Sequence, residues 1–514
     1  MVPTVYFDRA KQKPVVKFCL FLSRPDEALR FGRSHVGKDG EIGPLPAKHI
    51  VNIPDIEEWK TQRRHMSDAF LPLGPITASV GTLEKMSDEM ILKWRQALSS
   101  ATSATASANA QGLPLGPNQL DVREWMHHTA FGMFVACMLG DDRAFSPAVE
   151  DPLSLDVDLY SDYEEDVSFL NAVPLNSLPA RSLFNLEDIG NSSSPKVQQK
   201  KFIKALGYVG KLITRGEERQ EHNQAVGPLM ERILELKTEE KIANTLATLV
   251  AGHDTTAYTM QFTLMELAKQ PKIQDRVRKE CQDILHAIQL SGRALEYSDL
   301  PRFELLTKCI CETLRMWNVA AIVFPRVTSF EDQLIGSLGG EEGEGEGKEE
   351  GEGDNRPTVT IPKGTKFSFW YYGQHHSTEL WGEDAMEWNP DRDWHPYELQ
   401  RSIDPNDALW ENGKTPCTSR FHPFSVPTRD CLGKNFAMTE MRVLLPRILC
   451  NFQIDIPQGS ELMHVQPREG DPVYDAWSRT IGGPCQPHAM NLQLTPLEKP
   501  LTPGGGHRVS ASKL

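Results

Sequence analysis

The stretch FHPFSVPTRDCLGKNFAMTEMR, from Phe421 to Arg442, decides the fold class of this chain. It reads as a loop that leads to Cys431, followed at once by a helix. The N-terminus of that helix and nearby backbone N–H groups favour a thiolate at the cysteine. Gly433 would let the helix come close to a flat ligand, and Arg429 could pair with a carboxylate. The alternative is a buried structural cysteine before an amphipathic helix, which C-x-G alone does not exclude.

The segment resembles the haem-binding loop of the cytochromes P-450, whose pattern is F-x-x-G-x-R-x-C-x-G. Phe424, Arg429, Cys431 and Gly433 match this pattern, whereas Pro427 stands where the family has its first glycine. The resemblance implies that Cys431 ligates the iron of haem b (iron protoporphyrin IX), that Phe424 packs beside the thiolate and that Arg429 pairs with a haem propionate. Because proline fixes φ and has no N–H, we expect the loop to be less well formed than in relatives.

A second motif, AGHDTT from Ala251, lies within the longest predicted helix, which covers residues 238 to 269. The motif resembles the oxygen-binding pattern A-G-x-D-T-T of the same family. Gly252 would leave room for dioxygen, and the hydroxyl of Thr255 could compete for a backbone carbonyl and open the helix locally. Asp254 and Thr255 are the expected catalytic pair that relays protons. The alternative is a helix with polar residues at a bend.

Three further residues resemble haem contacts of the family. Trp59 and Arg63 match W-x-x-x-R and lie on one face of a helix predicted from Ile56 to Phe70. The resemblance implies that both donate to a propionate. Arg326, in FPRVTSFED, matches the arginine that reaches the other propionate. Taken singly, each could be a surface charge or a core tryptophan.

A charge network is expected from the pattern E-T-L-R, which places Glu312 and Arg315 on one face of a helix predicted over residues 302 to 317. It resembles the E-x-x-R of the family, whose third member matches Arg392 in WNPDRDW. This last segment departs from the usual F-x-P-E-R-F. The resemblance implies a buried triad of Glu312, Arg315 and Arg392 that shapes the loop before Cys431, a structural role. Alone, E-x-x-R is mostly a surface ion pair.

The composition argues against several kinds of partner, structural site and targeting segment. The net charge of −15 argues against nucleic acid as a partner. Nine cysteines without a C-x-x-C pair make a disulfide framework or a structural zinc site improbable and favour a reducing compartment. No run of 18 apolar residues occurs, so we expect no transmembrane anchor in this chain. The N-terminus shows no secretory signal pattern.

The resemblance extends over most of the chain and predicts one cytochrome P-450 domain, residues 1–485, that is short at its N-terminus. An acidic low-complexity insert at 339–354 reads as the tip of an expanded hairpin. Residues 486–514 form an expected flexible tail. The implied fold is mainly α with small β-sheets, and the haem lies buried between the long central helix and the cysteine loop.

The implied reaction is monooxygenation, in which one atom of dioxygen enters an apolar small-molecule substrate. No flavin or nicotinamide fingerprint is visible, so electrons would come from an NADPH-dependent flavin reductase. Two alternatives stay open. One is a haem-thiolate isomerase or dehydratase, against which the intact Asp254 and Thr255 argue. The other is an inactive relative, which the short segment before Val15 would support.

The last three residues, Ser512-Lys513-Leu514, match a peroxisomal address. They follow a segment rich in glycine and proline that would present the terminus to a receptor. We therefore expect a peroxisomal location. The alternative is the surface of the endoplasmic reticulum membrane, if the N-terminus is incomplete.

Overall fold

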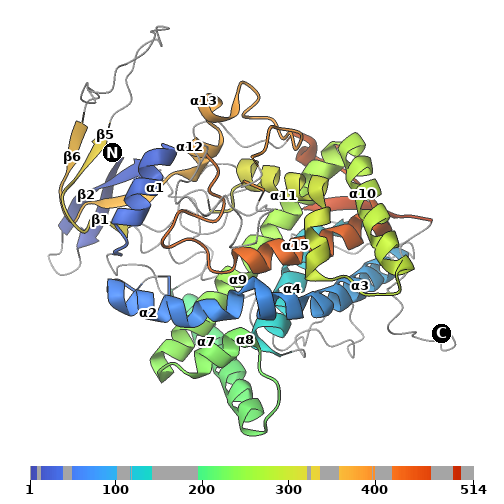
Figure 1. Ribbon diagram of the computed structural model, residues 1–514, viewed down its shortest axis with the longest axis horizontal. Helices are drawn as coiled ribbons and strands as arrows, with labels where there is room; N and C mark the ends of the chain where they lie inside the picture. The colour runs from blue at the N-terminus through green and yellow to red at the C-terminus, as the bar shows by residue number, and fades with distance from the viewer. Residues whose placement is uncertain are drawn as a thin grey trace.

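A computed structural model describes residues 2–8, 13–38, 49–51, 53–100, 116, 118–141, 195–320, 326–335, 358–395, 398–399, 420–464 and 490–498. Helices dominate these residues, and small sheets accompany them (Figure 1). This confirms the expected mainly α architecture with small β-sheets.

Helix α9, Thr238–Lys269, is the central element and has the bounds that its sequence predicts. Apolar residues occur on most of its sides, and most of its side chains are buried, as expected for a core helix. It ends where Pro271 starts helix α10, Pro271–Leu290. Proline suits that first position because the N–H it lacks would have no partner within the helix.

Four helices enclose α9 or pack on its neighbours: α3 (Thr77–Ser100), α4 (Val122–Phe134), α11 (Glu304–Met316) and α15 (Lys434–Asn451). Figure 1 shows α4, α9 and α15 crossing near the middle of the molecule. Their buried apolar side chains belong to one continuous cluster. Helix α15 is the helix expected after Cys431, and Gly433 is its N-cap.

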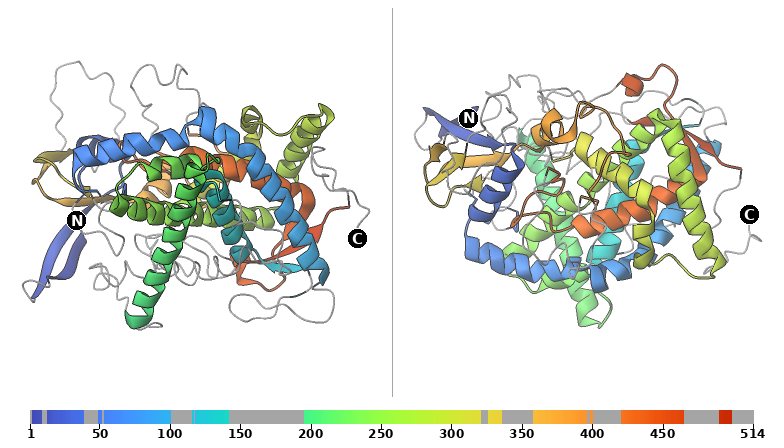
Figure 2. Two further views of the ribbon diagram at one scale, coloured as in Figure 1. Left: turned by 90° about the horizontal axis from the view of Figure 1, so that it is seen from below. Right: turned by 45° about the horizontal axis from the view of Figure 1, so that its top comes forward.

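The remaining helical segments surround this core. They are α1 (Pro25–Ser34), α2 (Ile56–Ser67), η1 (Asp68–Phe70), η2 (Pro72–Ile76), η3 (Val135–Leu139), α7 (Pro195–Glu221), α8 (Pro228–Leu234), η6 (Tyr297–Arg302), α12 (Tyr371–His375), α13 (Thr378–Trp381) and η7 (Glu461–His464). Helix α7 projects from the body (Figure 2). The helix predicted over roughly 302–317 is α11, and its bounds agree with the prediction to within two residues. Phe303, with a non-helical ψ of 70°, separates η6 from α11.

The strands form separate small sheets. Strands β1 (Val2–Asp8), β2 (Lys13–Leu22), β7 (Lys366–Phe369) and β4 (Arg326–Val327) pair in that order, and β3 (Gln119–Asp121), β9 (Asn491–Pro496) and β8 (Phe452–Asp455) form a second sheet. Strands β5 (Asp332–Ile335) and β6 (Thr358–Ile361) form an antiparallel pair. This pair flanks the acidic insert, as expected of a hairpin, although the insert at 339–354 lies outside the described residues. Among the described helices, none has the length and apolar character needed to span a bilayer.

Candidate functional site

A cavity of about 300 Å³ lies between α9 and the loop that leads into α15. This volume is within the range of ligand pockets in proteins. Residues far apart in the sequence meet in its wall, which includes Trp59, Arg63, Thr255, Arg326, Phe424, Arg429, Cys431 and Gly433. The structure thus brings all the predicted cofactor-binding residues and the predicted iron ligand to one place. Asp254 is not part of the wall.

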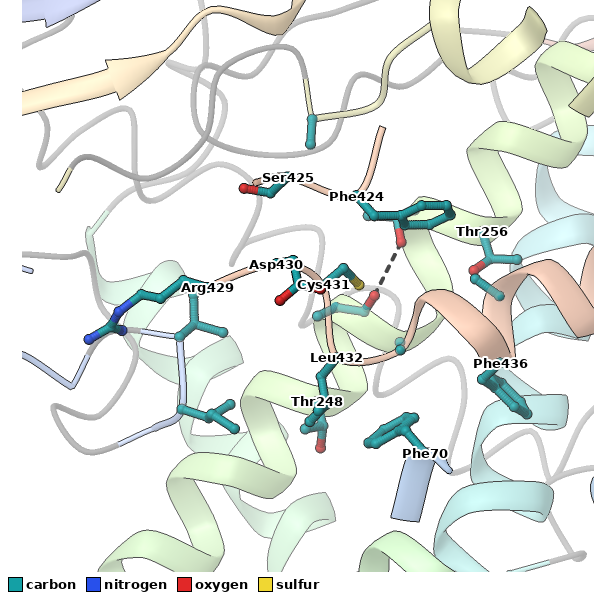
Figure 3. Close-up of a pocket in the computed structure, with 18 of the residues that line it drawn as sticks. Phe70, Thr248, Thr256, Phe424, Ser425, Arg429, Asp430, Cys431, Leu432 and Phe436 are labelled. Atoms are coloured by element: carbon teal, nitrogen blue, oxygen red, sulfur yellow. Dashed lines mark hydrogen bonds between the residues drawn. The ribbon is translucent and has the colours of Figure 1, made fainter. Parts of the chain in front are cut away.

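Cys431 faces this cavity. Its backbone N–H donates to the carbonyl of Phe424 at 2.8 Å, which folds the loop back on itself (Figure 3). The side chain of Cys431 is exposed toward the cavity, whereas the other free cysteines of the described chain are buried. Burial within the protein raises the pKa of the Cys431 thiol, and a hydrogen bond from the Gly433 backbone opposes this. The expected helix effect is therefore present but smaller than the effect of burial.

The loop before Cys431 is held by contacts that the sequence does not suggest. Ser425 adopts a positive φ of 68°, the conformation for which glycine is usually needed. The buried Val426 N–H donates to the Tyr371 hydroxyl at 3.0 Å, and that hydroxyl donates to Ser425 Oγ at 3.0 Å. The left-handed residue of this loop is thus Ser425, two positions before Pro427.

Arg429 extends from the loop, away from Cys431 (Figure 3). Its guanidinium group packs on the ring of Trp59, 4.3 Å from the ring centroid. Its Nε donates to the Val36 carbonyl at 2.7 Å and its Nη2 to the Ile53 carbonyl at 2.8 Å. Its Nη1 is buried and has no hydrogen-bond partner among the described residues. Burial, reinforced by the charges of two other arginines, lowers the pKa of Arg429 to about 9. An anionic group beside Arg429 would accept a hydrogen bond from Nη1 and would also stabilise the buried positive charge.

Arg326 and Arg63 supply the other two guanidinium groups. Arg326 is buried and donates to the carbonyl groups of Gly32 and Val426, and burial lowers its pKa to about 10. Arg63 donates to the backbone carbonyl of Asp430 at 2.6 Å and to its carboxylate at 3.1 Å. Asp430 is the only acidic residue that the described part of the chain contributes to the cavity wall.

The wall therefore carries excess positive charge around an exposed thiol. A Cβ at Gly433 would meet only Phe70, at 3.7 Å, so no described protein atom requires glycine there. The open helix start, the unpaired Nη1 of Arg429 and the facing sulfur of Cys431 together fit haem, a flat group with two carboxylate arms and an iron atom that thiolates bind. The donor set agrees with the cofactor that the resemblance implies.

Helix α9 forms the opposite wall. The hydroxyl of Thr255 donates to the Ala251 carbonyl at 3.2 Å, but α9 remains continuous, so the expected local opening is not present. Gly252 lies on the cavity wall, as expected, and it has a second role. A Cβ there would come within 2.3 Å of the Phe134 ring, so glycine is needed for packing against α4 and not only for free space.

Asp254 points away from the cavity into the interface of α9 with α4. Its Oδ1 lies 3.3 Å from His127 Nδ1 and 3.0 Å from His253 Nε2, and all three side chains are buried. The structure therefore brings Thr255 to the cavity wall and holds the adjacent Asp254 behind it.

Glu312, Arg315 and Arg392 meet in a buried network. Glu312 accepts from Arg315 Nε and Nη2 and from Arg392 Nε, each at 2.8 Å. Arg315 also donates to the carbonyl groups of His375 and Ala385. The network thus fastens α11 to the segment between α12 and the cysteine loop, without touching the cavity.

Comparison with known proteins agrees with this geometry. The family model for cytochrome P450 matches residues 38–337 and 354–470, most of the chain. The chain belongs to the cytochrome P450 family. The gap in the match, residues 338–353, covers all but the last residue of the acidic insert, and both signature segments around Ala251 and Cys431 lie inside the matched ranges.

Individual relatives are similar to this chain only over part of their length. This P450 is 30% identical to a cytokinin hydroxylase of Arabidopsis thaliana over 211 residues, 41% of the chain and 32% of the relative. It is 31% identical to cytochrome P450 4F1 of Rattus norvegicus over 227 residues, 44% of the chain and 36% of the relative. It is 29% identical to an ultra-long-chain fatty acid omega-hydroxylase of Homo sapiens over 222 residues, 43% of the chain and 34% of the relative. The chain spans about a third of the length of these relatives.

The sequence reasoning missed several residues of this P450 site. His127 and His253 hold Asp254, Asp430 holds Arg63, and Tyr371 ties down the cysteine loop. His253 occupies the variable position of the A-G-x-D-T-T motif, so its place in the motif is only a weak indication of a functional role. The others are distant in sequence from their partners, and no local pattern marks them.

Proposed function

We propose that this P450 is a haem-thiolate monooxygenase that inserts one atom of dioxygen into an apolar organic substrate. The observation that carries the proposal is Cys431, the cysteine that faces a cavity lined by three arginines. In this proposal Cys431 holds the iron and Phe424 packs beside the sulfur. Haem b, once bound, supplies the oxygen chemistry, with the thiolate favouring cleavage of the O–O bond.

The remaining wall residues would orient the cofactor. Arg429 and Trp59 stand on one side and Arg326 on another, and each can donate toward a carboxylate in the cavity. Arg63 would share its guanidinium between Asp430 and a propionate. Thr255 would hold a proton at its hydroxyl on the distal wall, and Asp254 would supply that proton.

The paired Asp254 and Thr255 favour monooxygenation over isomerisation of a hydroperoxide. A monooxygenase consumes two protons for each dioxygen molecule, whereas an isomerase needs no proton relay. Electrons would come from a separate NADPH-dependent flavin reductase. The relatives' names point to different substrates, cytokinins and ultra-long-chain fatty acids, so we propose only an apolar substrate class.

The test uses the purified full-length chain with such a reductase, NADPH and isotope-labelled dioxygen, on a panel that includes fatty acids and isoprenoid adenines. We expect label in an alcohol product, in amounts that require NADPH. Conversion of hydroperoxides without NADPH would show an isomerase instead. Failure to bind haem, seen as no thiolate-type band in the reduced carbon monoxide complex, would show an inactive relative.

We also propose that the protein is imported into peroxisomes through Ser512-Lys513-Leu514, which lie outside the described residues. The alternative is the surface of the endoplasmic reticulum membrane. A fluorescent protein fused to the N-terminus leaves the signal free. Punctate fluorescence that disperses when Leu514 is deleted supports the proposal, and a reticular pattern that the deletion does not change refutes it.

A further inference from the structure

A buried cluster of two histidines and one aspartate lies behind Thr255. His253 and Asp254 of α9 and His127 of α4 form a buried cluster whose ligand-type atoms all lie within 4.8 Å of one another. The ring of Tyr258 packs on His127, with centroids 4.6 Å apart, and Phe131 packs on His253, with centroids 5.3 Å apart. These rings help to separate the cluster from solvent.

The protons of the His253–Asp254 pair can be counted from its contacts. His253 Nδ1 lies 2.6 Å from the Leu249 carbonyl, and a carbonyl only accepts, so Nδ1 carries a proton. His253 Nε2 lies 3.0 Å from Asp254 Oδ1. A second proton must therefore lie between these two atoms, since two lone pairs would repel at this distance. The pair holds one proton more than a neutral imidazole and a carboxylate.

The position of that proton follows from the second histidine. His127 Nδ1 also approaches Asp254 Oδ1, at 3.3 Å, so the same oxygen accepts from two rings. Burial would raise the pKa of Asp254, but the charges and hydrogen bonds of His253 and His127 hold it below its ordinary value. Both contacts favour the carboxylate form of Asp254, so the shared proton is assigned to His253 Nε2 and the inferred resting state is an imidazolium–carboxylate ion pair.

We propose that this ion pair is a loaded proton store for Thr255, with His127 and His253 as positioning residues. The inference rests on the proposed monooxygenase function and deepens it. The Nε2–H bond of His253 breaks and an O–H bond forms on Asp254, which leaves a neutral imidazole that keeps its Nδ1–H. Both groups are then neutral, so the attraction that held Asp254 behind the wall is lost.

The neutral carboxyl group can then turn toward the next residue, Thr255, whose hydroxyl is on the cavity wall. It donates its proton to Thr255 Oγ1, which releases its own proton into the cavity. Asp254 is again a carboxylate, and one proton that originates in bulk water must reach His253 Nε2 to restore the ion pair. One proton is delivered for each cycle, and no oxidant or reductant is consumed in these steps.

The charge state is tested first, without turnover. The haem-loaded protein, labelled with ¹⁵N in its histidines, is examined by NMR as the diamagnetic ferrous carbon monoxide complex. We expect one imidazole protonated on both nitrogens at a pH where exposed histidines are neutral, and this signal should vanish in His253→Gln. The matched control is His128→Asn. His128 follows His127 in α4 and is partly exposed, so this variant should keep the signal of the doubly protonated imidazole. A neutral His253, or one equivalent of bound zinc in the purified protein, would overturn the proposal.

Turnover is tested with laurate as the probe, or with whichever member of the panel the wild-type protein hydroxylates. Glutamine can imitate the Nε2 donor of His253 but cannot carry its extra proton. We expect His253→Gln to lower product formed per NADPH about tenfold, with the difference released as peroxide. His127→Asn, which keeps a donor near Nδ1, should lose less, and His128→Asn nothing. Unchanged coupling in His253→Gln refutes the store, whereas no product from wild type on any substrate refutes the proposed function and leaves the NMR result standing.

Discussion

Replacing Glu312 by glutamine should destabilise the fold strongly although the shape of the side chain hardly changes. Glu312 is fully buried and accepts four hydrogen bonds at 2.8 Å, two from Arg315, one from Arg392 and one from the backbone N–H of Asn389. Glutamine would turn an NH₂ group toward these donors. It would also leave the fully buried guanidinium of Arg315 without its carboxylate.

The magnitude follows from this burial. Removing one partner of a buried, hydrogen-bonded ion pair typically costs about 3–5 kcal/mol, because the other charge stays desolvated. Arg392 keeps a second carboxylate partner, Asp384, so the substitution costs less stabilising free energy at Arg392 than at Arg315. We therefore expect a decrease of about 3–4 kcal/mol in the free energy of unfolding, more than a hundredfold in the folding equilibrium.

The assay is urea unfolding of the wild-type and variant proteins, followed by circular dichroism and tryptophan fluorescence. The control is Asp391→Asn in the same segment. It breaks the ion pair of Asp391 with Arg276, whose side chains are 48% and 52% exposed, and should cost less than about 1 kcal/mol. If Glu312→Gln costs no more than Asp391→Asn, the buried network does not stabilise the fold as argued.

Four further outcomes are expected. Cys431→Ala should lose the thiolate-type spectrum of the reduced carbon monoxide complex, whereas Cys309→Ala, buried away from the cavity, should keep it; the same spectrum in both would contradict the ligand assignment. Thr255→Ala should bind haem but divert reducing equivalents to peroxide, and unchanged product per NADPH would favour an isomerase. Tyr371→Phe should lower the unfolding free energy by about 2 kcal/mol, because the buried Val426 N–H loses its acceptor; a urea midpoint equal to wild type would refute this. Burial lowers the pKa of His422 to about 4, so the folded state binds fewer protons than the unfolded state between about pH 4 and 6.5. Stability should therefore rise with pH in that window, by up to about 1.4 kcal/mol per pH unit from this residue, and His422→Gln should flatten the slope in urea titrations at several pH values.

Local signals predicted the central elements well. The apolar spacing before Pro271 defined α9, and the residues around Cys431 defined the start of α15. These features depend on neighbours in the sequence, so a single chain is enough to read them. The pattern before Trp317 likewise predicted α11 to within two residues, whereas the short 3₁₀ helix η6 before it was not predicted.

The orientation of site residues could not be predicted in the same way. The sequence predicts Asp254 as a proton relay for Thr255, but the direction of its side chain depends on where α4 places His127, a tertiary contact between residues more than a hundred positions apart. The packing of Gly252 also depends on a distant residue, because the ring of Phe134 occupies the space that a Cβ at position 252 would need. Sequence patterns predicted several of the residues that line the cavity, and packing decided which way their side chains face.

The arginines of the cavity connect the cofactor to stability. The lowered pKa values of Arg326 and Arg429 show that the fold holds two guanidinium groups where water solvates them poorly, and the wall offers only Asp430 as a described counter-charge. Such an arrangement costs folding free energy unless an anion enters. A ligand with two carboxylates that binds only the folded state returns that free energy and shifts the unfolding equilibrium by mass action. In the proposed site, the charges that would orient the propionates are therefore the same charges that would link the stability of the folded chain to haem binding.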